Sequence, residues 1–249
     1  SAGKWEMDFD SLVTLIDSKT KMIIISNPHN PVGRVWTPEE LRGLAEICLQ
    51  NNILILSDEI HSDLVLPGFT HTPLASLSEK IADTTITFIA PSKTFNLAGL
   101  STSSVIISNP GLRKSFNRIL ENLHVGNGNI FGTIASIASY THGHEWLEAL
   151  LDYIDHNIDF VGDYCRKMIP EIIPVMPEAT YMIWLDCRKF GMTGKELQNF
   201  FLTRAGIGMN EGSTFGPGGE GFMRMNLGTT HQTVMKAMEQ IEKAVSALR

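Results

Sequence analysis

A single lysine, Lys93, lies directly after an apolar run at residues 84–90, whose length and composition predict a buried strand. The residues at positions 97–100 are again apolar or small. A lysine amine that is partly shielded from water by such neighbours can act as a nucleophile or as a base. On its own, Lys93 is better explained as a solvated loop residue, because most lysines are exposed. The residues upstream of it decide between these interpretations.

Two more apolar runs of strand length, at residues 21–26 and 53–57, precede Lys93. A helix is predicted between them at residues 38–50, because Thr37 and Glu40 stand at the positions of a capping box and a proline occupies the first helical position. The order strand, helix, strand predicts a right-handed crossover and therefore a parallel pair of strands.

Polar residues follow each of these predicted strands. Asn30 lies in the proline-rich and glycine-containing loop after the first strand, Asp58 and His61 follow the second, and Lys93 follows the third. Taken singly, Asn30 fits a turn former, Asp58 a cap and His61 a buried core histidine. Taken together, they indicate a site, because the carboxyl ends of parallel strands meet at one edge of a sheet. We therefore expect these four residues to line one crevice.

The remaining pattern predicts an α/β fold with a large domain at residues 1–140, containing a mostly parallel sheet, and a linking helix with a smaller α/β domain at residues 141–249. Arg224 lies at the centre of a strand predicted at residues 222–227, where it is either paired structurally or available to an anionic ligand. The other predicted elements are a strand at 105–108, helices at 109–122, 130–140 and 145–168, a strand at 181–185, and helices at 194–206 and 231–248.

Composition narrows the class of partner. The 249 residues are 43% apolar, so the chain can bury a large core, and its formal net charge is −7 with no basic block. Nucleic acid and anionic membrane are therefore poor partners, and a small molecule is expected instead. Three scattered cysteines and the lack of a long apolar run or a signal peptide favour a cytoplasmic protein.

Three motifs carry a family resemblance: Asn-Pro-His-Asn-Pro-Val-Gly at residues 27–33, Asp-Glu-Ile-His at 58–61 and Ser-Lys-Thr-Phe-Asn at 92–96. Their order and spacing resemble the class I/II aminotransferase family of fold-type I pyridoxal-phosphate enzymes. Within this family the chain looks most like the MalY/PatB-type cystathionine β-lyase, or C–S lyase, branch. The resemblance implies the aspartate aminotransferase fold, pyridoxal 5′-phosphate as the cofactor, and a homodimer.

The resemblance also implies roles for the polar residues. Lys93 would be the Schiff-base lysine that holds the aldehyde carbon of the cofactor and later moves the substrate α-proton. Asp58 would pair with the pyridine nitrogen and keep it protonated, and Asn30 would donate to the phenolic oxygen of the ring. His61 stands where many aminotransferases carry a tyrosine that reaches the same oxygen. Ser92 would contact the phosphate.

Arg224 matches the arginine that binds the substrate α-carboxylate in the family. The chain departs from the aminotransferase pattern at residues 99–103, which contain no arginine to hold the phosphate. The glycine-rich turn and the ring-stacking aromatic of the family would lie upstream of residue 1. We therefore expect an N-terminally truncated chain that carries only part of the cofactor site.

The expected activity is β-elimination from cystathionine or a related thioether amino acid, which gives a thiol, pyruvate and ammonia. Transamination between an L-amino acid and a 2-oxo acid is the alternative within the same cofactor class. A non-catalytic regulatory or binding protein on the same fold is a second alternative. The presence of Lys93, Asp58, Asn30 and Arg224 argues against it, because a binding module has no need of an electron sink.

Overall fold

The computed structural model describes residues 5–126 and 128–249, which divide into two compact units. We call residues 5–29 and 35–149 the N-terminal unit, and residues 30–34 and 150–249 the C-terminal unit. The sequence also predicts a flexible joint at residues 126–129, of which residue 127 lies outside the described residues, as do residues 1–4 of the predicted large domain. The predicted domain boundary after residue 140 stays a prediction.

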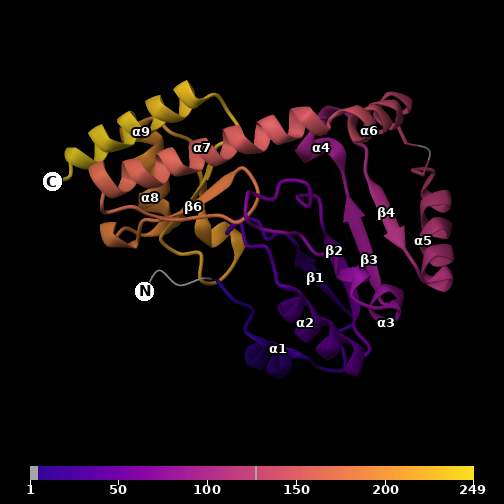
Figure 1. The fold of residues 1–249 in the computed structure, drawn as a ribbon. Coiled ribbons are helices and arrows are strands. Elements are labelled where there is room, and N and C mark those ends of the chain that lie inside the picture. Colours follow the sequence, from indigo (N-terminus) through magenta and orange to yellow (C-terminus); the bar gives the residue numbers. More distant parts are fainter. Residues whose placement is uncertain (1–4, 127) are drawn as a thin grey trace. The chain divides into compact units, whose positions relative to one another are not determined.

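The N-terminal unit is built on one four-stranded sheet (Figure 1). Its strands are β1 (Met22–Ser26), β2 (Leu54–Asp58), β3 (Thr85–Ile89) and β4 (Ser104–Ile107), in that spatial order. The pairs β1–β2 and β2–β3 are parallel, and β3–β4 is antiparallel. The predicted mostly parallel sheet is thereby confirmed. The helices are α1 (Phe9–Leu15), α2 (Pro38–Gln50), α3 (Glu79–Asp83), α4 (Pro91–Thr94), α5 (Pro110–Leu123), α6 (Ile130–His142) and the start of α7 (His144–Met168).

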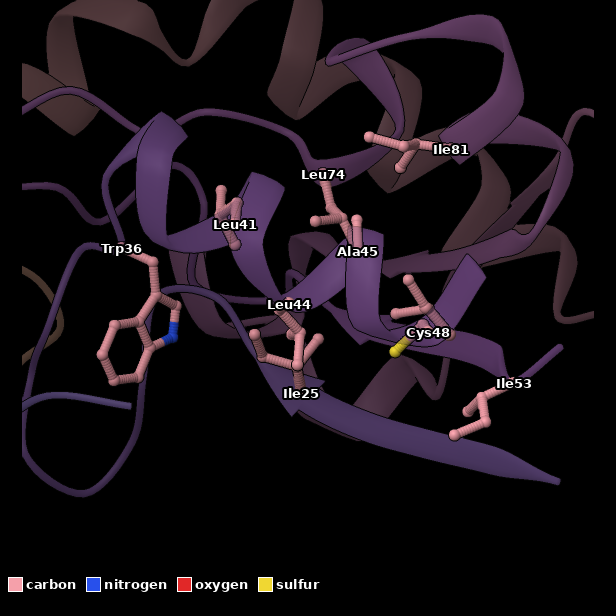
Figure 2. Packing of buried hydrophobic residues seen from close by; sticks show 10 residues of the cluster. Ile25, Trp36, Leu41, Leu44, Ala45, Cys48, Ile53, Leu74 and Ile81 are labelled. Atoms are coloured by element: carbon pink, nitrogen blue, oxygen red, sulfur yellow. The ribbon is translucent and has the colours of Figure 1, made fainter. Parts of the chain in front are cut away.

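Helix α2 forms where the sequence predicts it and covers part of the sheet. The hydroxyl of Thr37 accepts a hydrogen bond from the backbone N–H of Glu40, whose carboxylate accepts one from the N–H of Thr37, so the capping box is confirmed. The apolar residues of α2 recur at three- and four-residue spacing and pack in one buried cluster with residues of β1 and β2 (Figure 2). Its labelled members are Ile25, Trp36, Leu41, Leu44, Ala45, Cys48, Ile53, Leu74 and Ile81.

The C-terminal unit contains a second, antiparallel sheet. Its strands are β5 (Ile173–Val175), β6 (Met182–Asp186), β7 (Asn210–Glu211) and β8 (Phe222–Asn226), in the order β5-β6-β8-β7. The rest of α7, α8 (Gly194–Phe200), a π-helical turn at Phe201–Ala205 and α9 (His231–Ser246) complete the unit. The helices of the described residues are all too short or too polar to cross a membrane.

The α2 cluster predicts a measurable loss of stability. Leu41 is fully buried, so Leu41→Ala should remove apolar contacts, leave a cavity and lower the free energy of unfolding by about 2–5 kcal/mol in urea denaturation. Leu15→Ala in α1 is the matched control, because Leu15 is 77% exposed and its loss should change stability by less than about 0.5 kcal/mol. Equal effects of the two substitutions would contradict the described packing.

Candidate active site

The carboxyl edge of the parallel strands presents Asp58. Hydrogen bonds continue the parallel ladder past the strand ends, because the N–H of Asn27 donates to the carbonyl of Asp58 (2.9 Å) and the N–H of Glu59 donates to the carbonyl of Phe88 (2.8 Å). Asp58 therefore leaves the sheet between β1 and β3, opposite Ser26 and Phe88. Its Oδ1 accepts a bond of 3.3 Å from the N–H of Ile60, and its side chain is half-buried.

Lys93 follows the neighbouring strand β3 and belongs to the same unit as Asp58. It lies in the four-residue helix α4, which starts at Pro91, so the segment predicted as a strand end continues as a short helix. Lys93 and Ser92 are both half-buried. Lys93 has no hydrogen-bond or ion-pair partner among residues 5–126 and 128–249. Its amine is thus uncommitted in this structure, as a nucleophile or proton carrier requires.

His61, also predicted as a site residue, is only 3% exposed and lies in the turn that follows Asp58. From the sequence, His61 can also be interpreted as a buried core histidine. The structure places the residue in the N-terminal unit with Asp58, Ser92 and Lys93, and its contact with a cofactor stays a prediction.

The second acid of the Asp-Glu-Ile-His motif, to which the sequence assigns no role of its own, is a buried carboxylate next to Asp58. Glu59 is 2% exposed, and its Oε1 accepts hydrogen bonds from Ser57 Oγ (2.8 Å) and the N–H of Leu74 (3.1 Å), while Oε2 lies 2.9 Å from His71 Nε2. Asn27 Nδ2 also donates to the carbonyl of residue 72 (3.0 Å). These bonds hold the segment at residues 71–74 against two strand ends and so support the backbone that carries Asp58.

The C-terminal unit contains Arg224 at the centre of β8, as predicted. Its Nη1 donates to Asn30 Oδ1 and its Nη2 to Asn210 Oδ1, each at 2.9 Å, and its guanidinium carbon lies 4.6 Å from the ring centre of Phe215. Its Nε is buried and has no hydrogen-bond partner in the part of the chain described here. Burial lowers the pKa of Arg224, although the nearby Tyr181 acts in the opposite direction.

Within residues 5–126 and 128–249, no carboxylate neutralises the charge of Arg224. Its two hydrogen-bond acceptors are neutral amides. A guanidinium remains charged at neutral pH, and a partly buried charge without a counterion is costly. Of the two interpretations left open by the sequence, this environment favours an arginine that is available to an anionic ligand.

Asn30 is held beside Arg224 by the segment at residues 30–34. Arg34 and Glu178 form a buried ion pair (2.9 Å), and the carbonyl of Gly33 accepts from the N–H of Glu178 (2.7 Å). Gly33 has a φ of +73°, and a Cβ atom there would collide with Pro177. Glycine is therefore required at this position by both the backbone angle and the close approach.

The predicted site residues thus fall into two groups. Asp58, His61, Ser92 and Lys93 lie in the N-terminal unit, and Asn30 with Arg224 lies in the C-terminal unit. The expectation that Asn30, Asp58, His61 and Lys93 line one crevice stays a prediction.

The N-terminal unit thus carries a carboxylate and an uncommitted lysine after neighbouring strands of a mostly parallel sheet, and the C-terminal unit carries a partly buried arginine. The chain belongs to the aminotransferase class I and II family, whose family model matches residues 1–241.

Named relatives support the cystathionine β-lyase branch. The chain is 41% identical to the cystathionine β-lyase PatB of Bacillus subtilis over 98% of this chain and 63% of that protein. A pyridoxal-phosphate-bound protein of Clostridium difficile, described as a proposed aminotransferase, has a TM-score of 0.95 at 38% identity, covering 98% of this chain and 62% of that one. Cystalysin of Treponema denticola, which contains pyridoxal 5′-phosphate, has a TM-score of 0.93 at 38% identity, covering 100% and 64%. The chain therefore spans slightly less than two thirds of the length of these relatives.

The Glu59 network generates a prediction for stability. Glu59→Ala should leave the Ser57 hydroxyl, the Leu74 N–H and His71 buried without their acceptor, and should lower the free energy of unfolding by about 3 kcal/mol. The matched control is Glu46→Ala on the exposed side of α2, which should change stability by less than about 0.5 kcal/mol. Urea denaturation of both variants measures the difference, and a Glu59→Ala protein as stable as the control would rule out a supporting role for the network.

Proposed function

We propose that the protein containing this chain is a pyridoxal-phosphate-dependent C–S β-lyase. Its substrate would be cystathionine or a related thioether amino acid, which is converted with one water to a thiol, pyruvate and ammonia. The observation that carries the proposal is the 41% identity to a cystathionine β-lyase over 98% of the chain. When bound, the cofactor would supply a cationic ring that accepts electrons from the substrate Cα.

The two groups of residues fit such a cofactor and an amino-acid substrate. Lys93 is half-buried, and its amine has no partner among the described residues, so it would hold the aldehyde carbon and, once released, remove the proton from Cα. Asp58 would accept a hydrogen bond from the ring nitrogen. Support for this role comes from the partial burial of Asp58 and from its carboxylate, which among the described residues accepts one long bond, from the N–H of Ile60.

Asn30 would contact the cofactor ring, and Arg224 would bind the substrate. Because Asn30 Oδ1 accepts from Arg224, the remaining group of its amide is a donor, which is the type that the phenolic oxygen of the ring requires. The buried Nε of Arg224, which has no hydrogen-bond partner among the described residues, would donate to the substrate α-carboxylate. The negative charge of this carboxylate would neutralise the guanidinium. Roles for His61 at the ring oxygen and for Ser92 at the phosphate are part of the proposal.

Transamination is the second candidate function, because the matching family is named for aminotransferases. It would use the same residues as the β-elimination. The two reactions differ in whether the group at Cβ leaves before the proton returns. The absence of arginine from residues 99–103 favours the lyase. We further propose a cytoplasmic homodimer, with a large domain at residues 1–140 and a smaller one at 141–249.

An assay of the intact protein separates the two activities. With pyridoxal 5′-phosphate and cystathionine, it should form equimolar pyruvate and homocysteine without an added 2-oxo acid. Lys93→Ala should reduce this rate by at least about 10³-fold, because both covalent attachment and proton removal are lost. Conversion of an added 2-oxo acid into its amino acid, with cystathionine turned into the corresponding 2-oxo acid and no homocysteine or pyruvate released, would favour transamination. No turnover with either substrate set would favour the non-catalytic alternative.

Arg224 should contribute mainly to substrate binding. Arg224→Ala should raise KM for amino-acid substrates by about 10- to 100-fold, the range expected for a lost charge-assisted hydrogen bond. Arg204→Ala, which removes an exposed arginine of the same unit, is the matched control and should leave KM unchanged. Steady-state kinetics of both variants decide the point, and an unaltered KM in Arg224→Ala would assign Arg224 a purely structural role.

A further inference from the structure

Asp63 connects three segments of the N-terminal unit around the helix that carries Lys93. It lies in the turn after His61, and its Oδ2 accepts hydrogen bonds from Thr94 Oγ1 (2.9 Å) and Tyr140 Oη (3.4 Å). Thr94 is fully buried and is the residue directly after Lys93. Asp63 is therefore linked through one side-chain bond to the end of α4 and through another to α6.

Helix α4 is short and makes few hydrogen bonds of its own. It is four residues long, has no side-chain hydrogen bond at its N-cap, and ends with a bond from the N–H of Phe95 to the carbonyl of Pro91. The Phe95 ring then packs edge-on against Tyr140 at 5.5 Å and beside Trp146 at 5.8 Å. A helix of one turn does not hold its own direction, because nearly all of its backbone groups lie at its ends. The contacts at its carboxyl end therefore contribute to its orientation, together with the buried Ala90 and Pro91 at its start.

We propose that Asp63 is a positioning residue for Lys93, acting through its hydrogen bond to the Thr94 hydroxyl. The inference rests on the proposed role of Lys93 as the residue that holds the cofactor. Asp63 does not contact the reacting atoms itself. It fixes the rotation of α4 and hence the direction in which Lys93 leaves the helix.

Tyr140, in α6, also donates to Asp63 and so supports the position of the Asp63 carboxylate. Partial burial and the charge of Asp63 raise the pKa of Tyr140 to about 12, so its hydroxyl keeps its proton and remains a donor to the carboxylate at neutral pH. The bond from Thr94 is shorter than the bond from Tyr140, and the Thr94 hydroxyl is the buried one. A buried donor that loses its acceptor is costly, so the Thr94 bond should dominate.

A double-mutant cycle in the intact protein tests the proposal. Thr94→Val removes the donor and Asp63→Ala removes the acceptor. Each protein is saturated with pyridoxal 5′-phosphate and reduced with borohydride, and the fraction that gains the pyridoxyl mass on Lys93 is measured by mass spectrometry. The melting temperature is recorded for each variant. The matched control is Thr85→Val, because Thr85 is a 1% exposed threonine of the same unit whose hydroxyl donates one bond of 2.7 Å to the carbonyl of Ile81.

Each single variant should lower the ratio of linked to unlinked Lys93 about fivefold, the change that corresponds to one net hydrogen bond. The double variant should lose no more than either single one, since both act on one interaction. Thr94→Ser, which keeps the hydroxyl, should retain the wild-type ratio. Thr85→Val should lower the melting temperature by an amount similar to Thr94→Val and leave the ratio unchanged.

Other outcomes overturn the proposal. An unchanged ratio in Thr94→Val and Asp63→Ala at a lowered melting temperature would show that the bond only stabilises the fold. Additive losses in the double variant would show that the two residues act separately. If Thr94→Val does not fold, the decision passes to Asp63→Ala and Thr94→Ser, and equal ratios in these two would overturn it. A wild-type protein without any pyridoxyl mass on Lys93 would instead overturn the proposed function, and the positioning role with it.

Discussion

The parallel hydrogen-bonding of β1, β2 and β3 is the constraint on which the rest of the candidate site depends. Because the ladder continues past the strands, from Asn27 to Asp58 and from Glu59 to Phe88, polar residues that follow separate strands leave the sheet at one edge. Such residues need hydrogen-bond partners when they are buried. Glu59 obtains them from Ser57, residue 74 and His71, and this network supports the strand end that presents Asp58.

In the C-terminal unit, the comparable constraint is the charge of Arg224. Arg224 is placed on a central strand, where its guanidinium is partly buried and is met by the amide oxygens of Asn30 and Asn210 instead of a carboxylate. Neutral acceptors orient the side chain without cancelling its charge. The ion pair between Arg34 and Glu178 holds the segment that carries Asn30, so the orientation of Arg224 depends on a contact away from the guanidinium itself.

The sequence was informative where a local pattern determines the structure. Apolar runs predicted β1, β2 and β3, and the capping box predicted the start of α2. Strand β5 is absent from the predicted elements because it contains Pro174, which has no backbone N–H to donate, although a proline can stand in a strand at the edge of a sheet. The pairing of Arg224 with Asn30 was missed because the two residues are 194 positions apart, and no local pattern encodes such a contact.

The positions of Lys93 and Asp58 were predicted from strand ends and motifs, but the contacts that hold them were not. The bond from Thr94 to Asp63 spans 31 positions, and Glu59 and His71 are 12 apart in a segment without regular periodicity. These contacts require the folded sheet, which brings the turn after β2 next to the helix after β3. A sequence can indicate that a buried carboxylate needs partners, but the partners are chosen by the tertiary structure.

We propose that Lys93 and Asp58 hold the cofactor and that Arg224 binds the carboxylate of the substrate. The most direct test is a crystal structure of the intact protein with pyridoxal 5′-phosphate and a substrate-like amino acid that is not turned over. The account predicts density for the cofactor ring with its nitrogen about 3 Å from the Asp58 carboxylate, and the ligand carboxylate within about 3 Å of Arg224. A cofactor bound away from Asp58 and Lys93, or an amino-acid carboxylate bound without Arg224, would contradict it.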